Sequence, residues 1–326
     1  MKAPEEFCED ISKYYPEKDQ FSSWYVLLCV LNAILTLSAT FGNIIIICAL
    51  TKTTSALSTS KILLFGLAVS DLGVGLVVQP LYISVITEIL LKDSVSPNDS
   101  ECNTKIAFLV LGAFLTSASF FIVSAISFDR FLAITLHLRY REIVTERKVT
   151  ITIFVLWTLS AVAPVGYLFI GEMKREIVSI TFTITFFVTT TITFAKIYLA
   201  VRRHRSQIST QERITGENRK ELVLRKRKFK SAMNIFYLYA VFAACFLPYT
   251  CTKFAIAITG HSLVLKGVFQ FSMTVGLLNS SLNPIIFSWR MEEIRGNILE
   301  TLIRSLPCLK VARVFQMNPQ KELSTA

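Results

Sequence analysis

Polar side chains stand inside several long apolar stretches of this 326-residue chain. Asp71 lies in the middle of one stretch, Asn279 and Asn283 lie one helical turn apart in another, and Ser119 lies within a third. A charged group surrounded by hydrocarbon costs about 2.5–3.5 kcal/mol, so such a residue needs a polar partner or a function. Two interpretations stay open. These residues form a hydrogen-bonded network between helices, or Asp71 and nearby hydroxyl and amide oxygens bind a hard cation such as sodium.

The residues that usually carry enzymatic chemistry are few and scattered. The three histidines, His137, His204 and His261, fall at or beyond the ends of the apolar stretches, on both sides. They form no triad or metal grouping. We therefore predict no catalytic residues and no enzyme activity, and we expect no cofactor apart from the candidate sodium ion.

The apolar residues occur in seven blocks separated by charges, at residues 24–50, 60–87, 104–136, 149–170, 177–201, 231–258 and 264–289. Each block is long enough for a helix to cross a hydrocarbon core, which takes about 20 residues. Only 17% of the residues are charged, whereas soluble domains carry about 25%. No block alternates with period two, so helices rather than strands are expected. We predict an all-α membrane protein, a seven-transmembrane-helix bundle over residues 24–289.

The distribution of basic residues along the chain predicts how the bundle is oriented in the membrane. Most of the 34 lysines and arginines follow the first, third and fifth blocks or lie in the C-terminal tail. The positive-inside rule places these segments in the cytoplasm and residues 1–23 outside the cell. Asn98, which begins a glycosylation sequon, then also lies outside. We expect a multi-pass plasma-membrane protein whose net charge of +11 reflects contact with anionic membrane lipids and does not indicate nucleic-acid binding.

Six short motifs occur in order along the predicted helices. They are Gly42-Asn43, Leu67-Ala68-Val69-Ser70-Asp71, Asp129-Arg130-Phe131, Trp157, Cys245-Phe246-Leu247-Pro248 and Asn279-Ser280-Ser281-Leu282-Asn283-Pro284-Ile285-Ile286-Phe287. Together they resemble the signature set of the rhodopsin family, class A of the G-protein-coupled receptors, over roughly residues 24–305. One motif alone would be weak evidence, whereas six in order are specific.

The resemblance implies a receptor that binds an extracellular ligand in the upper helix bundle and activates a heterotrimeric G protein by outward movement of the sixth helix. Arg130 matches the arginine that holds the resting state and then contacts the G protein, with Asp129 as its counter-charge. Pro248 matches the proline about which helix six swings, and its missing backbone N–H kinks the helix. The matching coupling and activation residues are Asp129, Arg130, Phe131, Tyr198, Pro248, Asn283, Pro284 and Phe287. Arrestin and receptor kinases are further expected partners.

Four positions depart from the family pattern. Phe131 and Phe287 replace motif tyrosines, and Phe246 replaces the toggle tryptophan. Lys228 stands where many members carry an acid at the inner end of helix six, so it cannot pair with Arg130. This predicts measurable ligand-free signalling, although Lys228 also fits an ordinary basic helix end at the headgroups. An orphan or chemosensory receptor with strong basal activity is therefore an alternative.

The family's geometry implies a mostly apolar ligand pocket in the upper bundle. Its lining would be Gly112, Ala113, Thr116, Phe246, Tyr249, Thr250, Lys253, Phe269 and Met273. Such a pocket suits a small-molecule or lipid-like ligand. Lys253 either pairs with an acidic group of the ligand or reaches outward to the headgroups. The resemblance also favours sodium as the ion bound by Asp71, Ser119, Asn279 and Asn283.

The cysteines and the loop after the fourth predicted helix indicate which branch of the family the chain resembles. That loop, about residues 171–176, is short and has no cysteine, so the family's usual loop disulfide is missing. These features resemble the melanocortin, lysophospholipid, cannabinoid and adenosine-like group. Cys8 and Cys102 both lie outside and could pair instead, which the sequence leaves open. Residues 290–305 match the amphipathic eighth helix, and residues 306–326 form a cytoplasmic tail in which Cys308 is a palmitoylation candidate.

A membrane transporter is the alternative from a different functional class. Transporters usually show internal repeats and broken helices, and the sequence has no internal repeat that would divide seven spans into halves. The basic stretch at residues 202–230 flanks Arg130 together with Leu138-Arg139-Tyr140, and its section at 206–218 is polar and expected to be mobile. We expect these two regions to meet the G protein.

Overall fold

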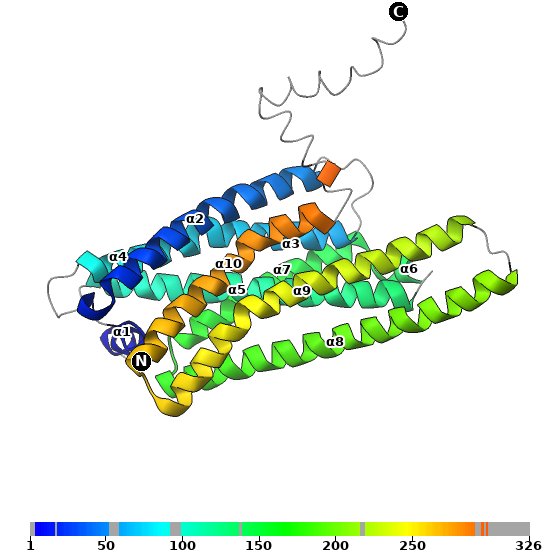
Figure 1. Ribbon diagram of the computed structural model, residues 1–326. Coiled ribbons are helices and arrows are strands. Elements are labelled where there is room, and N and C mark those ends of the chain that lie inside the picture. The colour runs from blue at the N-terminus through cyan, green and yellow to red at the C-terminus, as the bar shows by residue number, and fades with distance from the viewer. Residues whose placement is uncertain are drawn as a thin grey trace, which may run out of the picture.

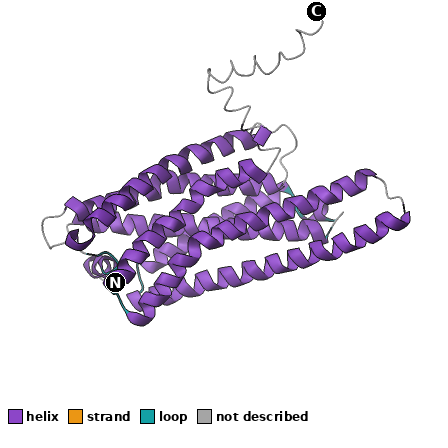
Figure 2. Ribbon diagram, in the orientation of Figure 1, coloured by secondary structure: helices purple, strands orange, loops and turns teal. Residues whose placement is uncertain are grey.

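The computed structural model describes residues 4–16, 18–51, 59–91, 99–136, 139–215, 219–290, 295–296 and 298. All regular secondary structure in these residues is helical (Figure 2). In chain order the elements are α1 (Pro4–Ser12), α2 (Lys18–Thr51), α3 (Thr59–Gly73), the π-helical η1 (Val74–Val78), α4 (Gln79–Leu91), α5 (Asp99–Thr135), α6 (Tyr140–Ile143), α7 (Glu146–Tyr167), α8 (Glu172–Thr215), α9 (Arg219–Thr259) and α10 (Leu263–Arg290). Figure 1 shows the long helices running along a common axis, with α1 at one end of the bundle.

Six helical runs are long and apolar enough to cross a membrane: Phe21–Thr51, Thr59–Leu91, Ser100–Thr135, Glu146–Tyr167, Met173–Leu199 and Phe236–Thr259. They overlap the first six predicted blocks, which confirms an all-helical membrane fold. The seventh block forms α10, which packs against α2 and α9. Because α10 is not one of the six runs, its crossing of the membrane stays a prediction.

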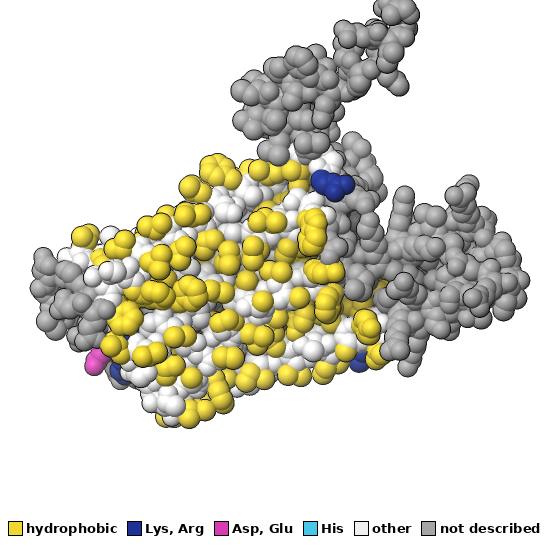
Figure 3. Space-filling model, in the orientation of Figure 1, with side chains coloured by type: hydrophobic (Ala, Val, Ile, Leu, Met, Phe, Trp, Pro, Cys, Tyr) yellow, Lys and Arg dark blue, Asp and Glu magenta, His cyan; other side chains and the backbone are white. Residues whose placement is uncertain are grey.

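The outer surface of the bundle is apolar. Ile34 on α2, Phe154 and Val162 on α7, and Ile192 on α8 are each at least half exposed. Figure 3 shows hydrophobic side chains spread along the visible long face. Such a surface is expected where hydrocarbon rather than water surrounds the helices.

The inward side chains form two clusters. One includes Ile46, Leu67 and Phe242, and the other, next to α1, includes Tyr25 and Tyr82. Between them α5 contacts α3, α4, α7 and α8, so it lies at the centre of the bundle. Residues on α5 are therefore positioned to contact both ends of the bundle.

A π-helical segment interrupts the second span, where the sequence predicts a continuous helix. Gly75 lies in this segment, and a Cβ there would be only 2.9 Å from the backbone nitrogen of Thr40 on α2. Pro80 follows directly and has no N–H to donate to the preceding turn. Short π-helical segments of this kind relieve such local mismatches in a helix.

The helices α8 and α9 extend past the predicted membrane blocks. The predicted membrane blocks end at residue 201 and begin again at residue 231, whereas α8 continues to Thr215 and α9 begins at Arg219. The physical reason is composition: arginine, glutamine and glutamate favour helix, and no glycine or proline occurs there before residue 216. At its other end α8 begins at Glu172, so the connection from α7 is shorter than predicted.

Candidate functional site

A cavity of about 290 Å³ lies in the half of the bundle next to α1. The predicted pocket residues that line it are Gly112, Ala113, Thr116, Phe246, Tyr249, Lys253, Phe269 and Met273. Thr250, also expected there, is not among the lining residues. It lies one residue beyond Tyr249, about 100° further around the helix, and its hydroxyl donates to the Phe246 carbonyl at 3.0 Å.

Aromatic rings form the floor of the cavity and join α5, α8 and α9. The rings of Phe120 on α5 and Phe246 on α9 meet edge to face, with centroids 4.9 Å apart. Phe120 also stacks on Phe186 of α8 at 4.5 Å and contacts Phe242 of α9 at 4.8 Å. A ligand that touches Phe246 therefore acts on the packing between α9 and the centre of the bundle.

Lys253 is one of the residues that line the cavity. Its side chain is about 10% exposed, and its ammonium forms an ion pair with Glu176 of α8 at 2.9 Å. The same ammonium donates to the Ser179 hydroxyl at 3.3 Å and lies 5.8 Å from the centre of the Tyr249 ring. This buried pair connects α8 and α9 beside the cavity.

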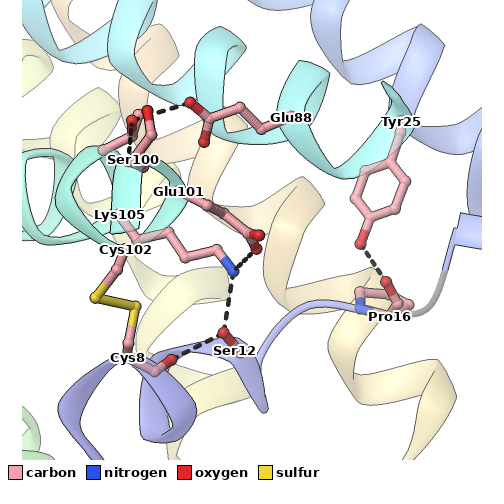
Figure 4. Close-up of polar contacts among 10 residues, drawn as sticks. Cys8, Ser12, Pro16, Tyr25, Glu88, Ser100, Glu101, Cys102 and Lys105 are labelled. Atoms are coloured by element: carbon pink, nitrogen blue, oxygen red, sulfur yellow. Dashed lines mark hydrogen bonds and ion pairs between the residues drawn. A yellow bond between two sulfur atoms is a disulfide. The ribbon is translucent and has the colours of Figure 1, made fainter. Parts of the chain in front are cut away.

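The N-terminal segment, residues 4–16, folds over this end of the bundle. A disulfide joins Cys8 in α1 to Cys102 at the start of α5, the pairing that the sequence leaves open. Figure 4 shows the disulfide beside Lys105, whose ammonium donates to the Ser12 hydroxyl at 3.0 Å and pairs with Glu101. These contacts fix α1 on α5.

Further contacts attach the same segment to three other helices. Asp10 pairs with Arg175 of α8 at 3.3 Å, and the Tyr14 carbonyl accepts from the Gln270 amide of α10 at 3.0 Å. The Pro16 carbonyl accepts from the Tyr25 hydroxyl of α2 at 2.7 Å (Figure 4). Tyr15 is almost fully enclosed, and burial raises the pKa of its phenol well above the usual value. Apart from Cys8, nothing in the sequence predicts that residues 4–16 fold over this end of the bundle.

The residues around Asp71 form a second polar site, in the middle of the bundle. One carboxylate oxygen of Asp71 accepts from the Ser280 hydroxyl at 2.8 Å, and the other accepts from the Asn283 amide at 2.6 Å. Asn43 joins the same region, because its amide donates to the Ser280 carbonyl at 3.0 Å. Ser280 is a contact that the sequence reasoning missed, although it lies within the quoted motif on α10.

Several buried oxygens of this middle region accept no hydrogen bond within the described part of the chain. They are the hydroxyl oxygen of Ser119 and the amide oxygens of Asn43, Asn279 and Asn283. Buried polar atoms usually have partners. Hydroxyl and amide oxygens beside a carboxylate are suitable ligands for a hard monovalent cation.

Asp129 is the centre of a third polar site, at the end of α5 that lies away from α1. Its carboxylate pairs with the Arg130 guanidinium at 2.9 Å and accepts from the Tyr140 hydroxyl at 2.5 Å and the Ser60 hydroxyl at 3.2 Å. Burial, together with the hydrogen bond to Asp129, raises the pKa of Tyr140 to about 12. The arginine is thus held beside a carboxylate that α3 and α6 also bind.

The other predicted residues lie as follows. Phe131 packs against the inner core cluster, Phe287 is buried, and Tyr198 is exposed on α8. Pro248 and Pro284 lie inside α9 and α10. The side chain of Lys228, Asn98, Cys308 and most of residues 290–305 lie outside the described residues.

Comparison with known proteins identifies the family. Residues 42–287 match the family described as 7 transmembrane receptor (rhodopsin family). The chain is 22% identical to the adenosine receptor A3 of Ovis aries over 311 residues, which covers 88% of this chain and 93% of that receptor. It is 24% identical to the melatonin receptor type 1B of Mus musculus over 277 residues, 80% and 74% of the two chains, and 23% identical to the adenosine receptor A2a of Homo sapiens over 318 residues, 87% and 73%. These relatives are receptors rather than enzymes and agree with the adenosine-like branch. The chain therefore belongs to the rhodopsin family of seven-transmembrane G-protein-coupled receptors, which are multi-pass membrane proteins.

Proposed function

We propose that this receptor binds an extracellular small molecule in the cavity beneath α1 and activates a heterotrimeric G protein by outward movement of α9. The observation that supports this most directly is the position of Phe246. It lines the cavity and packs edge to face on Phe120, two residues before Pro248. A ligand that displaces this ring changes the contact between α9 and α5 at the point where proline weakens the helix.

At the inner end, release of Arg130 is the step that exposes the G-protein site. In the described arrangement Arg130 pairs with Asp129, whose carboxylate also binds Tyr140. Movement of the inner half of α9 away from α5 makes room for a partner that binds Arg130. A ligand that switches the population almost completely must bind the active arrangement about 5.5 kcal/mol more tightly than the resting one.

The membrane arrangement forms part of the proposal. Residues 1–23 lie outside the cell, residues 24–289 form seven spans with α10 as the last, residues 290–305 lie on the inner surface, and residues 306–326 form the tail. The tail and the inner ends of α8 and α9 are the surfaces offered to arrestin and to receptor kinases. Asn98 is glycosylated and Cys308 is palmitoylated in this arrangement.

A sodium ion fits the site around Asp71. The hydroxyl oxygen of Ser119 and the amide oxygens of Asn279 and Asn283 accept no hydrogen bond among the described residues, and Asp71 supplies the negative charge. When bound, the ion would neutralise the buried carboxylate and so stabilise the resting packing of α3 against α5 and α10. The site then acts as an allosteric control and not as a catalytic centre.

The test is ligand-free second-messenger output, cyclic AMP and calcium together, for the wild type and Arg130→Ala at matched surface expression. We expect measurable wild-type output, since Lys228 cannot pair with Arg130 to hold the resting state, and loss of that output in Arg130→Ala. If neither cyclic AMP nor calcium rises above the level of empty membrane, the same two second messengers are measured while a ligand library is screened, and that screen tests the proposed coupling. Output that persists unchanged in Arg130→Ala would contradict the proposed coupling.

A further inference from the structure

The outer end of the cavity is closed by the N-terminal segment. Ile11, Tyr14 and Tyr15 line the cavity from this segment, and each is no more than 9% exposed. The segment is attached to α5 by the disulfide, to α8 by an ion pair, and to α10 and α2 by hydrogen bonds. Attachment to four helices makes it a fixed cover rather than a loose tail.

The exposed part of the cavity lining lies on the side of the bundle. Among the described lining residues, Leu159 and Ala163 of α7 and Val178 of α8 are exposed, Leu159 to 54% and Val178 to 47%. All three lie within candidate membrane spans. Helix α7 packs against α3 and α5, and α8 packs against α5 and α9, whereas α7 and α8 share at most marginal contact. The exposed part of the cavity lining therefore lies on these two helices, on the face turned toward the lipid.

Each charged side chain that lines the cavity forms an ion pair with another described residue. Lys105 pairs with Glu101, Arg175 with Asp10, and Lys253 with Glu176, and of these partners only Glu176 also lines the cavity. A charged group of a ligand would compete with these buried pairs, and a partner that it displaced would stay buried without its counter-charge. Most of the remaining lining is aliphatic or aromatic. This composition favours a ligand without net charge.

We propose that the ligand is an uncharged, membrane-soluble small molecule that reaches the cavity sideways from the lipid, between α7 and α8, beneath a fixed N-terminal cover. The inference rests on the proposed function and deepens it by naming the class of ligand and its route. A water-soluble peptide does not fit, because the cover occupies the mouth through which it would bind.

The experiment measures chemical access to a thiol placed in the cavity. Gly112→Cys introduces it, since a Cβ at Gly112 meets only Val78 at 3.5 Å, an ordinary contact. Intact cells are treated with benzyl methanethiosulfonate, which dissolves in lipid, or with its trimethylammonium-ethyl counterpart, which carries a permanent charge. Modification is quantified by the mass of the peptide after purification. Each rate is divided by the rate of the same reagent at Lys174→Cys, an exposed position just outside the cavity.

We expect the normalised benzyl rate to exceed the charged rate by at least about tenfold, since a permanent charge enters hydrocarbon poorly. Ala163→Trp, which places a large ring in the opening, should slow the benzyl reagent severalfold. Val162→Trp is the matched control, because Val162 is 66% exposed on the same helix and does not line the cavity. Met273→Cys provides a second cavity thiol if Gly112→Cys does not reach the cell surface.

Two outcomes would overturn the inference. One is equal normalised rates for the two reagents, which would mean that the cavity is open to water. The other is equal slowing by Ala163→Trp and Val162→Trp, which would mean that the route does not pass between α7 and α8. Neither readout involves signalling, so a failure of G-protein coupling in the Arg130→Ala experiment is distinguishable from a failure of lateral access.

Discussion

The hydroxyl of Tyr140 donates to the carboxylate of Asp129 at 2.5 Å, and that same carboxylate pairs with Arg130 at 2.9 Å. Tyr140 begins the short helix α6, which follows α5 directly in the chain. The position of Arg130 is therefore coupled to α6 through one shared carboxylate. Ser60 and Thr59 of α3 also donate to this carboxylate, so it is well supplied with hydrogen bonds.

Asp129→Asn should raise ligand-free G-protein output. The change removes the charge that holds Arg130, and a hydrogen bond to a charged group contributes about 1.5–3 kcal/mol. A loss of that size would enrich the released state by about tenfold or more. The measurement is basal second-messenger output at matched surface expression. Tyr140→Phe is the control, since it removes one donor but keeps the ion pair, and it should change the output less. Unchanged or lower output in Asp129→Asn would contradict the role given to this pair.

Sodium should stabilise the detergent-solubilised receptor, and Asp71→Asn should abolish that effect. A ligand that binds only the folded state adds RT ln(1 + [L]/Kd) to its stability. The melting temperature is measured with increasing sodium chloride and, in parallel, with choline chloride at the same ionic strength. The wild type should melt at a higher temperature in sodium, whereas Asp71→Asn should respond equally to both salts. Equal response of the wild type to the two salts would rule out a sodium site at Asp71.

Lys253→Met should destabilise the receptor, and adding Glu176→Gln should restore most of the loss. Breaking a buried ion pair by removing one partner costs about 3–5 kcal/mol, because the other charge stays buried alone. Replacing both partners removes that penalty. Melting temperatures of the two single variants and the double variant form a complete cycle. If the losses of the two single variants simply add in the double variant, the ion pair seen at 2.9 Å does not contribute to stability.

The helices were predictable because their signal is long and local. A block of more than 20 apolar residues has few other structures open to it in a membrane. Asp129 and Arg130 could likewise be assigned together, since they are neighbours in one motif. The extension of α8 to Thr215 was not predicted because the membrane block was taken to end where the apolar residues end, although the polar residues that follow also favour helix.

The contacts that depend on distant segments could not be predicted. Asp10 and Arg175 are 165 residues apart, and nothing in either neighbourhood indicates the other. The short polar segment that forms α1 has no strong apolar block, so its place over the cavity is determined by tertiary contacts and the disulfide. The same holds for the ion pair between Lys253 and Glu176, which lie on different helices.

Gly75→Ala should lower the melting temperature of the receptor, whereas Gly166→Ala should not. A Cβ at Gly75 would lie 2.8 Å from the hydroxyl oxygen and 2.9 Å from the backbone nitrogen of Thr40, so α2 and η1 would have to separate. Overpacking of this kind typically costs about 1–3 kcal/mol. At Gly166, near the end of α7, a Cβ meets nothing within 4 Å, and the loss of backbone freedom in the unfolded chain should stabilise by about 0.4–1 kcal/mol. The comparison uses thermal melting of both variants in the same detergent. If Gly75→Ala and the wild type have the same melting temperature, α2 and η1 are not held as closely together as their backbones indicate.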